Sequence, residues 1–318
     1  MRILAVLLLA LSAHSAWAEG DALSWLQRIH GATQKLSYTG TFVYRSGDQA
    51  ETLRIVHVAG RNGAHERLET LEGQPREIVR SGDEVKCYLP ASMTVKVDKQ
   101  TDHLVFPALL PANLQEISEH YNVTKGGIER IAGFECQSIV LEPKDKMRYG
   151  HRLWADTNTG MLLKSQTFND KNEVVEQFAF TQIAIGGRIG QGQLKSRYVV
   201  ESRAWRVENS GAVATSLAAS GWSIKPELPG FKKVTEMKRT QGGSSEVGHV
   251  VYSDGLAAVS VFIEPMANKT SLPQPGLSRQ GAINIYSRQI AEHLVTVVGE
   301  APAESVKKIA DSVEYRKP

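Results

Sequence analysis

The chain has 318 residues, of which 22% are charged and 42% hydrophobic, and it carries 37 Lys and Arg against 34 Asp and Glu. At about 100–200 residues per domain, this length predicts two domains. The polar content excludes an integral membrane bundle, the formal charge of +3 gives a nucleic-acid-binding role no support, and two cysteines cannot build a Cys₄ metal site.

Residues 1–18 have the pattern of a secretory signal peptide. Arg2 precedes an apolar run over residues 3–11, and small residues then lead to Ala16-Trp17-Ala18, a small-x-small cleavage sequence. The run is shorter than the stretch of about 20 apolar residues that spans a membrane. We therefore expect cleavage after Ala18 and export of a soluble mature chain.

The first ~190 residues predict one large antiparallel sheet with a few helices. Leu23, Leu26 and Ile29 recur at helical spacing within 21–36, and the period then changes to two. A short helix interrupts the strands near Pro107–Asn122. The predicted strands begin at Ser37 and continue as 52–58, 67–71, 77–80, 84–89, 94–97, 127–131, 137–141, 148–155, 161–168 and 174–185.

Several of these strands carry apolar residues on both faces. Phe178 and Phe180 share one face of their strand, whereas Val175, Ile183 and Ile185 share the other. A sheet with one face in water alternates more cleanly. A curved sheet that wraps over a helix or encloses a cavity explains the pattern, and so does a two-layer core with both faces covered.

A segment of small residues, 209–220, predicts an exposed linker before a second, smaller α+β domain. Strands are predicted at 247–253, 256–263 and 293–298, and a helix at 302–313. The predicted division is a signal peptide (1–18), a large N-terminal domain (19–208), a linker (209–221) and a small C-terminal domain (222–318).

Export also favours a disulfide between Cys87 and Cys136, because both lie in strand-like runs and would meet an oxidising compartment. Closing a loop of about 50 residues would stabilise the fold by about 4 kcal/mol in the chain-entropy model. The alternative is two buried free thiols that pack as small apolar side chains.

No catalytic, cofactor-binding or metal-binding motif emerges. The chain contains no His-Glu-x-x-His and no Cys-x-x-Cys sequence, and residues 242–246 lack the second glycine of a nucleophile elbow. The glycine-rich run 186–192 has no following helix and predicts a turn rather than a phosphate loop. Nothing in these motifs favours an enzyme.

Two groups of residues suggest binding. Aromatic and long apolar side chains on the N-terminal strands can line an acyl-chain cavity, or they can simply fill a core. A cluster of basic residues can meet an acidic partner, or it can form a solvated face. The first group is Phe42, Tyr44, Tyr88, Met93, Phe106, Trp154, Phe168 and Phe178, and the second is Lys232, Lys233, Lys238 and Arg239.

A resemblance to a known family is more informative than these motifs. It rests on several sequence segments and on their order over essentially the whole mature chain, in both predicted domains. The segments are Arg130-Ile-Ala-Gly-Phe-Glu-Cys136, Arg148-Tyr-Gly150, Leu153-Trp-Ala-Asp156, Thr159-Gly160, Gln177-Phe178, Leu228-Pro-Gly-Phe231 and Tyr252-Ser-Asp-Gly-Leu-Ala-Ala-Val-Ser-Val-Phe262. With them the chain resembles the MucB/RseB family of periplasmic sigma-factor regulators.

The resemblance implies an α+β, mainly antiparallel fold, in which a half-open β-barrel like that of the lipoprotein carrier LolA precedes a smaller α+β domain. It implies a periplasmic, cofactor-free negative regulator, in a dimer or larger homo-oligomer. Such a protein binds the periplasmic domain of a membrane-anchored anti-sigma factor of the MucA or RseA kind and shields it from site-1 proteolysis. Lipid A, lipopolysaccharide or another acyl ligand releases it under envelope stress, with alginate production as the output.

The alternative is a periplasmic lipid or lipoprotein carrier without a regulatory partner. The barrel alone does not separate the two functions, because one fold hosts many functions. The second domain favours the regulator, since a plain carrier has little need of residues 222–318.

Overall fold

The computed structural model describes residues 21–60, 63–99, 110, 114–198, 205–209, 211–241, 245–266 and 275–317. The predicted signal peptide (1–18) and Phe106 therefore lie outside the described residues. Within the described part of the chain, no helix is both long and apolar enough to cross a bilayer.

Twelve strands of the described chain form one large sheet, here called the large sheet, and neighbouring strands are antiparallel except for the parallel pair β6–β12. The strands are β1 (Tyr38–Ser46), β2 (Gln49–Val58), β3 (His65–Thr70), β4 (Glu77–Ser81), β5 (Glu84–Leu89), β6 (Thr94–Lys99), β7 (Tyr121–Ile131), β8 (Phe134–Pro143), β9 (Gly150–Asp156), β10 (Leu162–Phe168), β11 (Val174–Ile185) and β12 (Arg206–Asn209). Their spatial order is β12-β6-β5-β4-β3-β2-β1-β11-β10-β9-β8-β7, an open order that confirms the predicted large, mainly antiparallel sheet.

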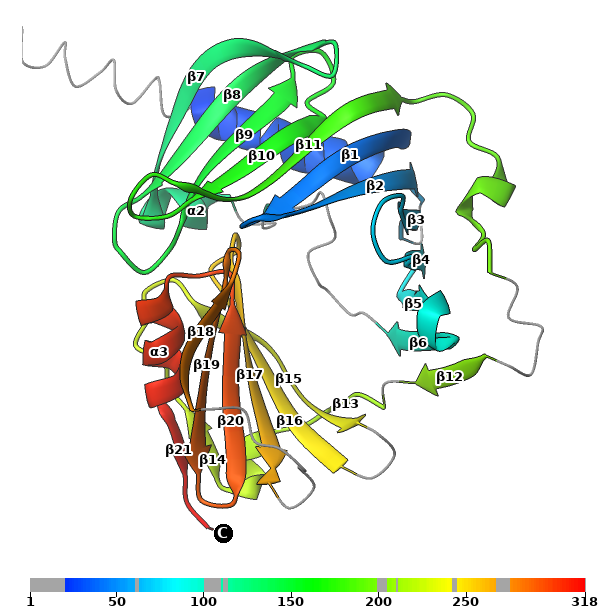
Figure 1. The fold of residues 1–318 in the computed structure, drawn as a ribbon. Coiled ribbons are helices and arrows are strands. Elements are labelled where there is room, and N and C mark those ends of the chain that lie inside the picture. Colours follow the sequence, from blue (N-terminus) through cyan, green and yellow to red (C-terminus); the bar gives the residue numbers. More distant parts are fainter. Residues whose placement is uncertain are drawn as a thin grey trace, which may run out of the picture.

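The large sheet curves over a helix of residues 21–35 (Figure 1). Ala22, Leu26 and Ile29 are buried on this helix, and they share one apolar cluster with Tyr38 of β1 and Trp154 of β9. The helix thus covers one face of the curved sheet. A register shift in the β1–β11 pairing places Ile183 and Ile185 on the same face as Phe178 and Phe180, and all four pack in this cluster, so these strands are less two-faced than the sequence indicates. The short helix α2 (Gln115–His120) precedes β7 and confirms the short helix predicted near 107–122, of which residues 107–109 and 111–113 lie outside the described residues.

Seven further strands of the described chain form a second sheet, here called the small sheet, in the order β13-β15-β16-β17-β20-β19-β18. They are β13 (Val213–Ala214), β15 (Lys232–Gln241), β16 (Ser245–Ser253), β17 (Ala258–Pro265), β18 (Gly276–Gln280), β19 (Ile283–Ile290) and β20 (His293–Gly299). Helix α3 (Ala303–Asp311) packs on β19 and β20 through Val306 and Ile309, and β14 (Trp222–Ile224) pairs with β21 (Val313–Tyr315). Short 3₁₀ turns are η1 (Pro90–Ser92), η2 (Gln191–Leu194) and η3 (Leu217–Ser220).

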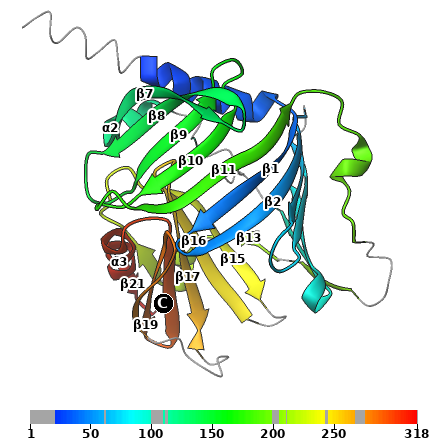
Figure 2. The same cartoon turned by 45° about the horizontal axis from the view of Figure 1, so that its top comes forward.

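The small sheet meets the large sheet end-on: the turns at one end of its strands approach β1 and β9–β11 (Figure 2). Leu256, from the turn before β17, belongs to the apolar cluster of the large sheet. The β18–β19 turn reaches β1, where the backbone N–H of Ala282 donates to Oγ of Ser46 at 3.4 Å. These contacts place the candidate site between the two sheets.

The segment predicted as an exposed linker is anchored at both ends. Strand β12 pairs with β6 of the large sheet, and β13 pairs with β15 of the small sheet. Leu217 is buried in the apolar cluster of the small sheet, and its N–H donates to Oε1 of Glu236 at 2.7 Å. Val213 is 64% exposed, and Ala214, Ser216, Ala218 and Ala219 are exposed as well, so the segment lies along the small sheet with most of its side chains in solvent.

The predicted disulfide is wrong in this structure, where Cys87 and Cys136 are both free thiols. Cys87 lies on β5 and Cys136 on β8, and seven strands of the large sheet lie between them in its order. Since neighbouring strands are spaced by about 4.8 Å, this separation is far beyond the Cα distance that a disulfide bridges. Strand-like patterns at both cysteines indicated the local structure, but not the distance across the sheet.

Candidate functional site between the two sheets

A buried ion pair joins the two sheets. Nη1 of Arg148, just before β9, lies 2.9 Å from Oδ2 of Asp254, in the turn between β16 and β17, and both side chains are fully buried. Arg148 also donates from Nε to Asp145 at 3.1 Å and from Nη2 to the carbonyl of Pro229 at 2.5 Å. Its guanidinium lies 5.6 Å from the ring centroid of Tyr121. The arginine is thus paired and hydrogen-bonded, as a buried charge must be.

Asp254 also organises its own turn. Its Oδ1 accepts the backbone N–H groups of Leu256 at 3.0 Å and Ala257 at 2.8 Å, while its Oδ2 accepts the hydroxyl of Tyr121 at 3.3 Å. The turn therefore presents Leu256 to the large sheet, where that side chain is 7% exposed. Burial, followed by the charge of Asp254, raises the pKa of Tyr121 and keeps its hydroxyl protonated.

Three segments that carry the family resemblance converge here, although they lie far apart in the sequence. Residues 148–150 supply the arginine, residues 228–231 supply a carbonyl and the Phe231 ring, and residues 252–262 supply Asp254 and Leu256. The neighbouring Tyr149 hydroxyl accepts a hydrogen bond from Nδ2 of Asn284 at 2.9 Å. The resemblance thus rests partly on the residues that dock one sheet against the other.

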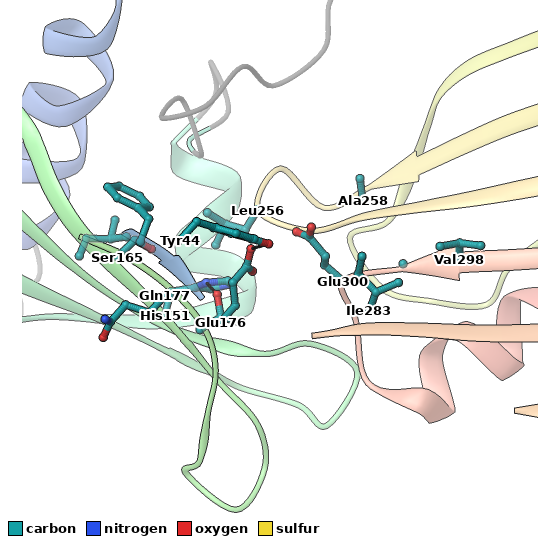
Figure 3. Close-up of a pocket in the computed structure, with 14 residues that line it drawn as sticks. Tyr44, His151, Ser165, Glu176, Gln177, Leu256, Ala258, Ile283, Val298 and Glu300 are labelled. Carbon is teal, nitrogen blue, oxygen red and sulfur yellow. Dashed lines mark hydrogen bonds between the residues drawn. The ribbon is translucent and has the colours of Figure 1, made fainter. Parts of the chain in front are cut away.

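Beside this contact lies a cavity of about 450 Å³, within the usual size range of ligand pockets (Figure 3). Strand register explains its wall on the large sheet, because residues paired across neighbouring strands project on the same face. One row runs Tyr44–Phe178–Ser165–Leu153 across β1, β11, β10 and β9, and the next runs Glu176–Thr167–His151. The small sheet supplies Leu256, Ala258, Ile283, Val298, Gly299 and Glu300.

Two carboxyl groups face each other from opposite sides of this cavity. Glu300 reaches from the end of β20 toward Tyr44 and Glu176 of the large sheet (Figure 3). The Tyr44 hydroxyl donates to Oε1 of Glu176 at 2.5 Å. Burial, reinforced by the nearby charge of Glu176, raises the pKa of Glu300 to about 7, and burial raises the pKa of Glu176 as well. Burial lowers the pKa of His151 to about 4, so this imidazole is neutral at pH 7.

The predicted aromatic group is divided among several environments. Phe42, Trp154 and Phe178 pack in the apolar cluster of the large sheet, and Phe168 is half-buried under the guanidinium of Arg152. Tyr44 and Phe178 line the cavity described above. Tyr88 packs against Tyr198 and Trp205, whereas Met93 is 42% exposed and has φ +46° at the end of η1. The structure brings together only part of this group, and whether it binds acyl chains stays a prediction.

The predicted basic cluster lies on β15, and each of its side chains is paired with a carboxylate of this chain. The pairs are Lys232–Glu116 at 2.7 Å, Lys233–Glu236 at 2.5 Å, Lys238–Glu246 at 3.1 Å and Arg239–Asp98 at 3.2 Å. The first of these joins the small sheet to helix α2, and the last joins it to β6 of the large sheet. Contact with an acidic partner therefore stays a prediction, and these residues also help to hold the two sheets together.

The motif search missed Arg148, Asp254, Glu176 and Glu300 as site residues. Arg148 and Asp254 lie inside segments that carry the resemblance, which was the available signal; Glu176 and Glu300 had none. In the described part of the chain, no group of three or more His, Cys, Asp and Glu side chains is arranged to hold a metal ion. The cavity combines apolar walls with carboxyl groups, an arrangement suited to binding.

Comparison with known proteins identifies the family. The model described as the MucB/RseB N-terminal domain matches residues 21–198, and that described as the MucB/RseB C-terminal domain matches residues 216–314. The chain is 30% identical to the sigma factor AlgU regulatory protein MucB of Pseudomonas aeruginosa, over 98% of each chain. It is 26% identical to the sigma-E factor regulatory protein RseB of Haemophilus influenzae, over 97% of this chain and 96% of that protein.

A solved structure shares the architecture. The crystal structure of MucB in complex with MucA(peri) superimposes with a TM-score of 0.70 and 27% identity, covering 93% of this chain and all of that one. These relatives are named as regulators and not as enzymes, in agreement with the expectation from the motif search. The match of both family models, in order and over both sheets, shows that the chain belongs to the MucB/RseB family.

Proposed function

We propose that the chain is a negative regulator of an extracytoplasmic-function sigma factor pathway that acts in the periplasm and binds the periplasmic domain of a membrane-anchored anti-sigma factor. The observation that carries this proposal is the likeness over 93% of the chain to MucB solved with MucA(peri). The relation extends over both sheets, so a partner that engages both is compatible with the fold. The signal-peptide pattern of residues 1–18 supports export.

In this proposal, the bound regulator shields the anti-sigma factor from site-1 proteolysis. Lipid A, lipopolysaccharide or a related acyl ligand releases it, and alginate production is controlled downstream. The two sheets act as the two domains, with residues 209–221 between them. A ligand displaces the anti-sigma factor only if it binds the free regulator more tightly than the complex, and the coupling is reciprocal.

The direct test is a titration of residues 19–318 with the soluble periplasmic domain of the anti-sigma factor from the same organism, followed by calorimetry. We expect binding, and we expect saturating lipid A to weaken it by roughly 5- to 150-fold, the range of typical allosteric couplings. In a parallel assay, the regulator should slow cleavage of that domain by the site-1 protease. Absence of anti-sigma binding would refute the proposal, and lipid binding without it would favour a lipid carrier.

A further inference from the structure

We propose that the cavity between the two sheets receives a basic side chain, lysine or arginine, of the bound anti-sigma segment, held between the carboxylates of Glu176 and Glu300. This inference rests on the proposed function for the identity of the partner, and on the geometry of the cavity for its chemistry. It gives the partner a defined anchor point that spans the large and small sheets.

The walls of the cavity match the two halves of a basic side chain. Leu153 and Phe178 of the large sheet and Ile283 and Val298 of the small sheet provide apolar surface for an aliphatic stem. Long basic side chains bury such stems along apolar surface while the charged head finds polar partners. Glu300, together with Glu176 across the cavity, supplies those partners (Figure 3).

The carboxyl groups have no cationic counterpart in the cavity lining. The described lining contains no lysine or arginine, and its single imidazole, His151, is kept neutral by burial, which lowers its pKa to about 4. Arg279, on the adjacent β18–β19 turn, donates from Nε to the carbonyl of Gly281 at 2.7 Å. Glu176 accepts the neutral hydroxyl of Tyr44, so no cationic side chain of the lining balances its ionised form. A guest cation would supply the missing charge.

Other ligand classes fit less well. The phosphates of a lipid headgroup would meet two carboxylates and be repelled by them. A divalent metal ion such as calcium takes six or more oxygen ligands, whereas the described residues offer no cluster of three or more candidate ligands. A basic side chain needs only the two carboxylates and the apolar walls.

Binding of a basic side chain in this cavity should release protons. Because the pKa of Glu300 is raised to about 7, mainly by burial and then by Glu176, a large fraction of this group is protonated in the free protein at pH 6.5. A bound cation favours the ionised form, so binding must release protons near this pH. The sign follows directly: affinity for a basic side chain should increase as the pH rises from about 5.5 to 7.5.

The first experiment tests the site without the anti-sigma factor. Blocked tripeptides with a central lysine, arginine or norleucine are titrated into residues 19–318, and the methyl resonances of Ile283 and Val298 are followed by NMR. We expect the basic peptides to bind at least about tenfold more tightly than the norleucine peptide, and Glu300→Gln and Glu176→Gln to abolish that preference. Glu227→Gln, the same change at an exposed residue outside the cavity lining, is the control and should leave it intact. Equal binding of all three peptides, or none, overturns the inference.

The second experiment uses the periplasmic domain of the anti-sigma factor. Calorimetry at pH 6.5 in two buffers of different ionisation enthalpy measures proton release, which we expect for the wild-type protein and not for Glu300→Gln. Replacing one particular lysine or arginine of the partner should weaken binding as Glu300→Gln does, with no further loss when both changes are combined. Anti-sigma binding that is indifferent to Glu176→Gln and Glu300→Gln refutes the inference and leaves the proposed function standing. Selective binding of the basic peptides without anti-sigma binding supports the site and refutes the proposed function.

Discussion

Breaking the Arg148–Asp254 pair should destabilise the protein far more than breaking an ion pair on its surface. Both side chains are fully buried and their charged atoms are 2.9 Å apart, so removing one partner leaves a buried charge that has lost its nearest counterion. Such changes cost about 3–5 kcal/mol. For Asp254→Asn we expect the lower end, about 3 kcal/mol, because Arg148 keeps Asp145 and the carbonyl of Pro229. Arg148→Met should cost a similar amount, because it leaves the Asp254 carboxylate with the Tyr121 hydroxyl and two backbone N–H groups.

The assay is urea unfolding followed by circular dichroism, with the free energy of unfolding extrapolated to water. The double variant should cost less than the sum of the two single variants, because each single change already leaves the other charge unpaired. Arg316→Met is the matched control: Arg316 is 89% exposed and lies 3.9 Å from Glu314, so its loss should change stability by less than about 1 kcal/mol. If Arg148→Met also lies within about 1 kcal/mol of the wild type, the two sheets are not held together by this pair and the reasoning fails.

Three further predictions follow from the described contacts. Since the pKa of Glu300 is raised to about 7 in the folded protein, its ionisation opposes folding, and stability should fall as the pH rises from about 4.5 to 7. In a profile of melting temperature against pH, Glu300→Gln should flatten this part of the curve. An unchanged profile would contradict the assignment. Cys87 and Cys136 should both be free in protein purified after export, and Cys136, whose pKa burial raises to about 11, should react with a thiol reagent only on unfolding; a mass two hydrogens lower would instead indicate a disulfide. Gly281→Ala should destabilise by more than about 1 kcal/mol in urea unfolding, because Gly281 has φ +60° and its new Cβ would meet Ser46; a neutral result would show that the turn relaxes.

Local features of the fold could be predicted because their causes are local. Apolar residues at helical spacing predicted the helix that the structure describes over 21–35, and alternation predicted β5 and β11 with the bounds that the structure has. The turn between β1 and β2 has the turn-forming sequence Ser46-Gly47-Asp48, and Gly47 adopts φ +59° there. Side-chain periodicity and turn chemistry act over a few residues, so one sequence suffices to detect them.

Features that depend on exposed strands or on distant residues could not be predicted in this way. Strand β15 begins with Lys232 and Lys233, so its sequence indicates a charged cluster, because exposed side chains at its start hide the alternation of a half-buried strand. Arg148 and Asp254 are 106 residues apart, and only the sheet topology brings them together. The position of Glu176 opposite Glu300 across the cavity likewise depends on how the two sheets dock, which no local pattern encodes.

Strand β12 also has a bearing on aggregation. By pairing in parallel with β6, it covers what would otherwise be the outer edge of the large sheet at that end, where unpaired N–H and C=O groups can recruit a strand from another molecule. Its own outer edge is short, only four residues, and carries the charges of Arg206 and Glu208, features that discourage such recruitment. A chain cut after residue 198 would keep strands β1–β11 but lose this cover, so the large sheet, produced alone, stays protected at that end only if residues 206–209 remain attached.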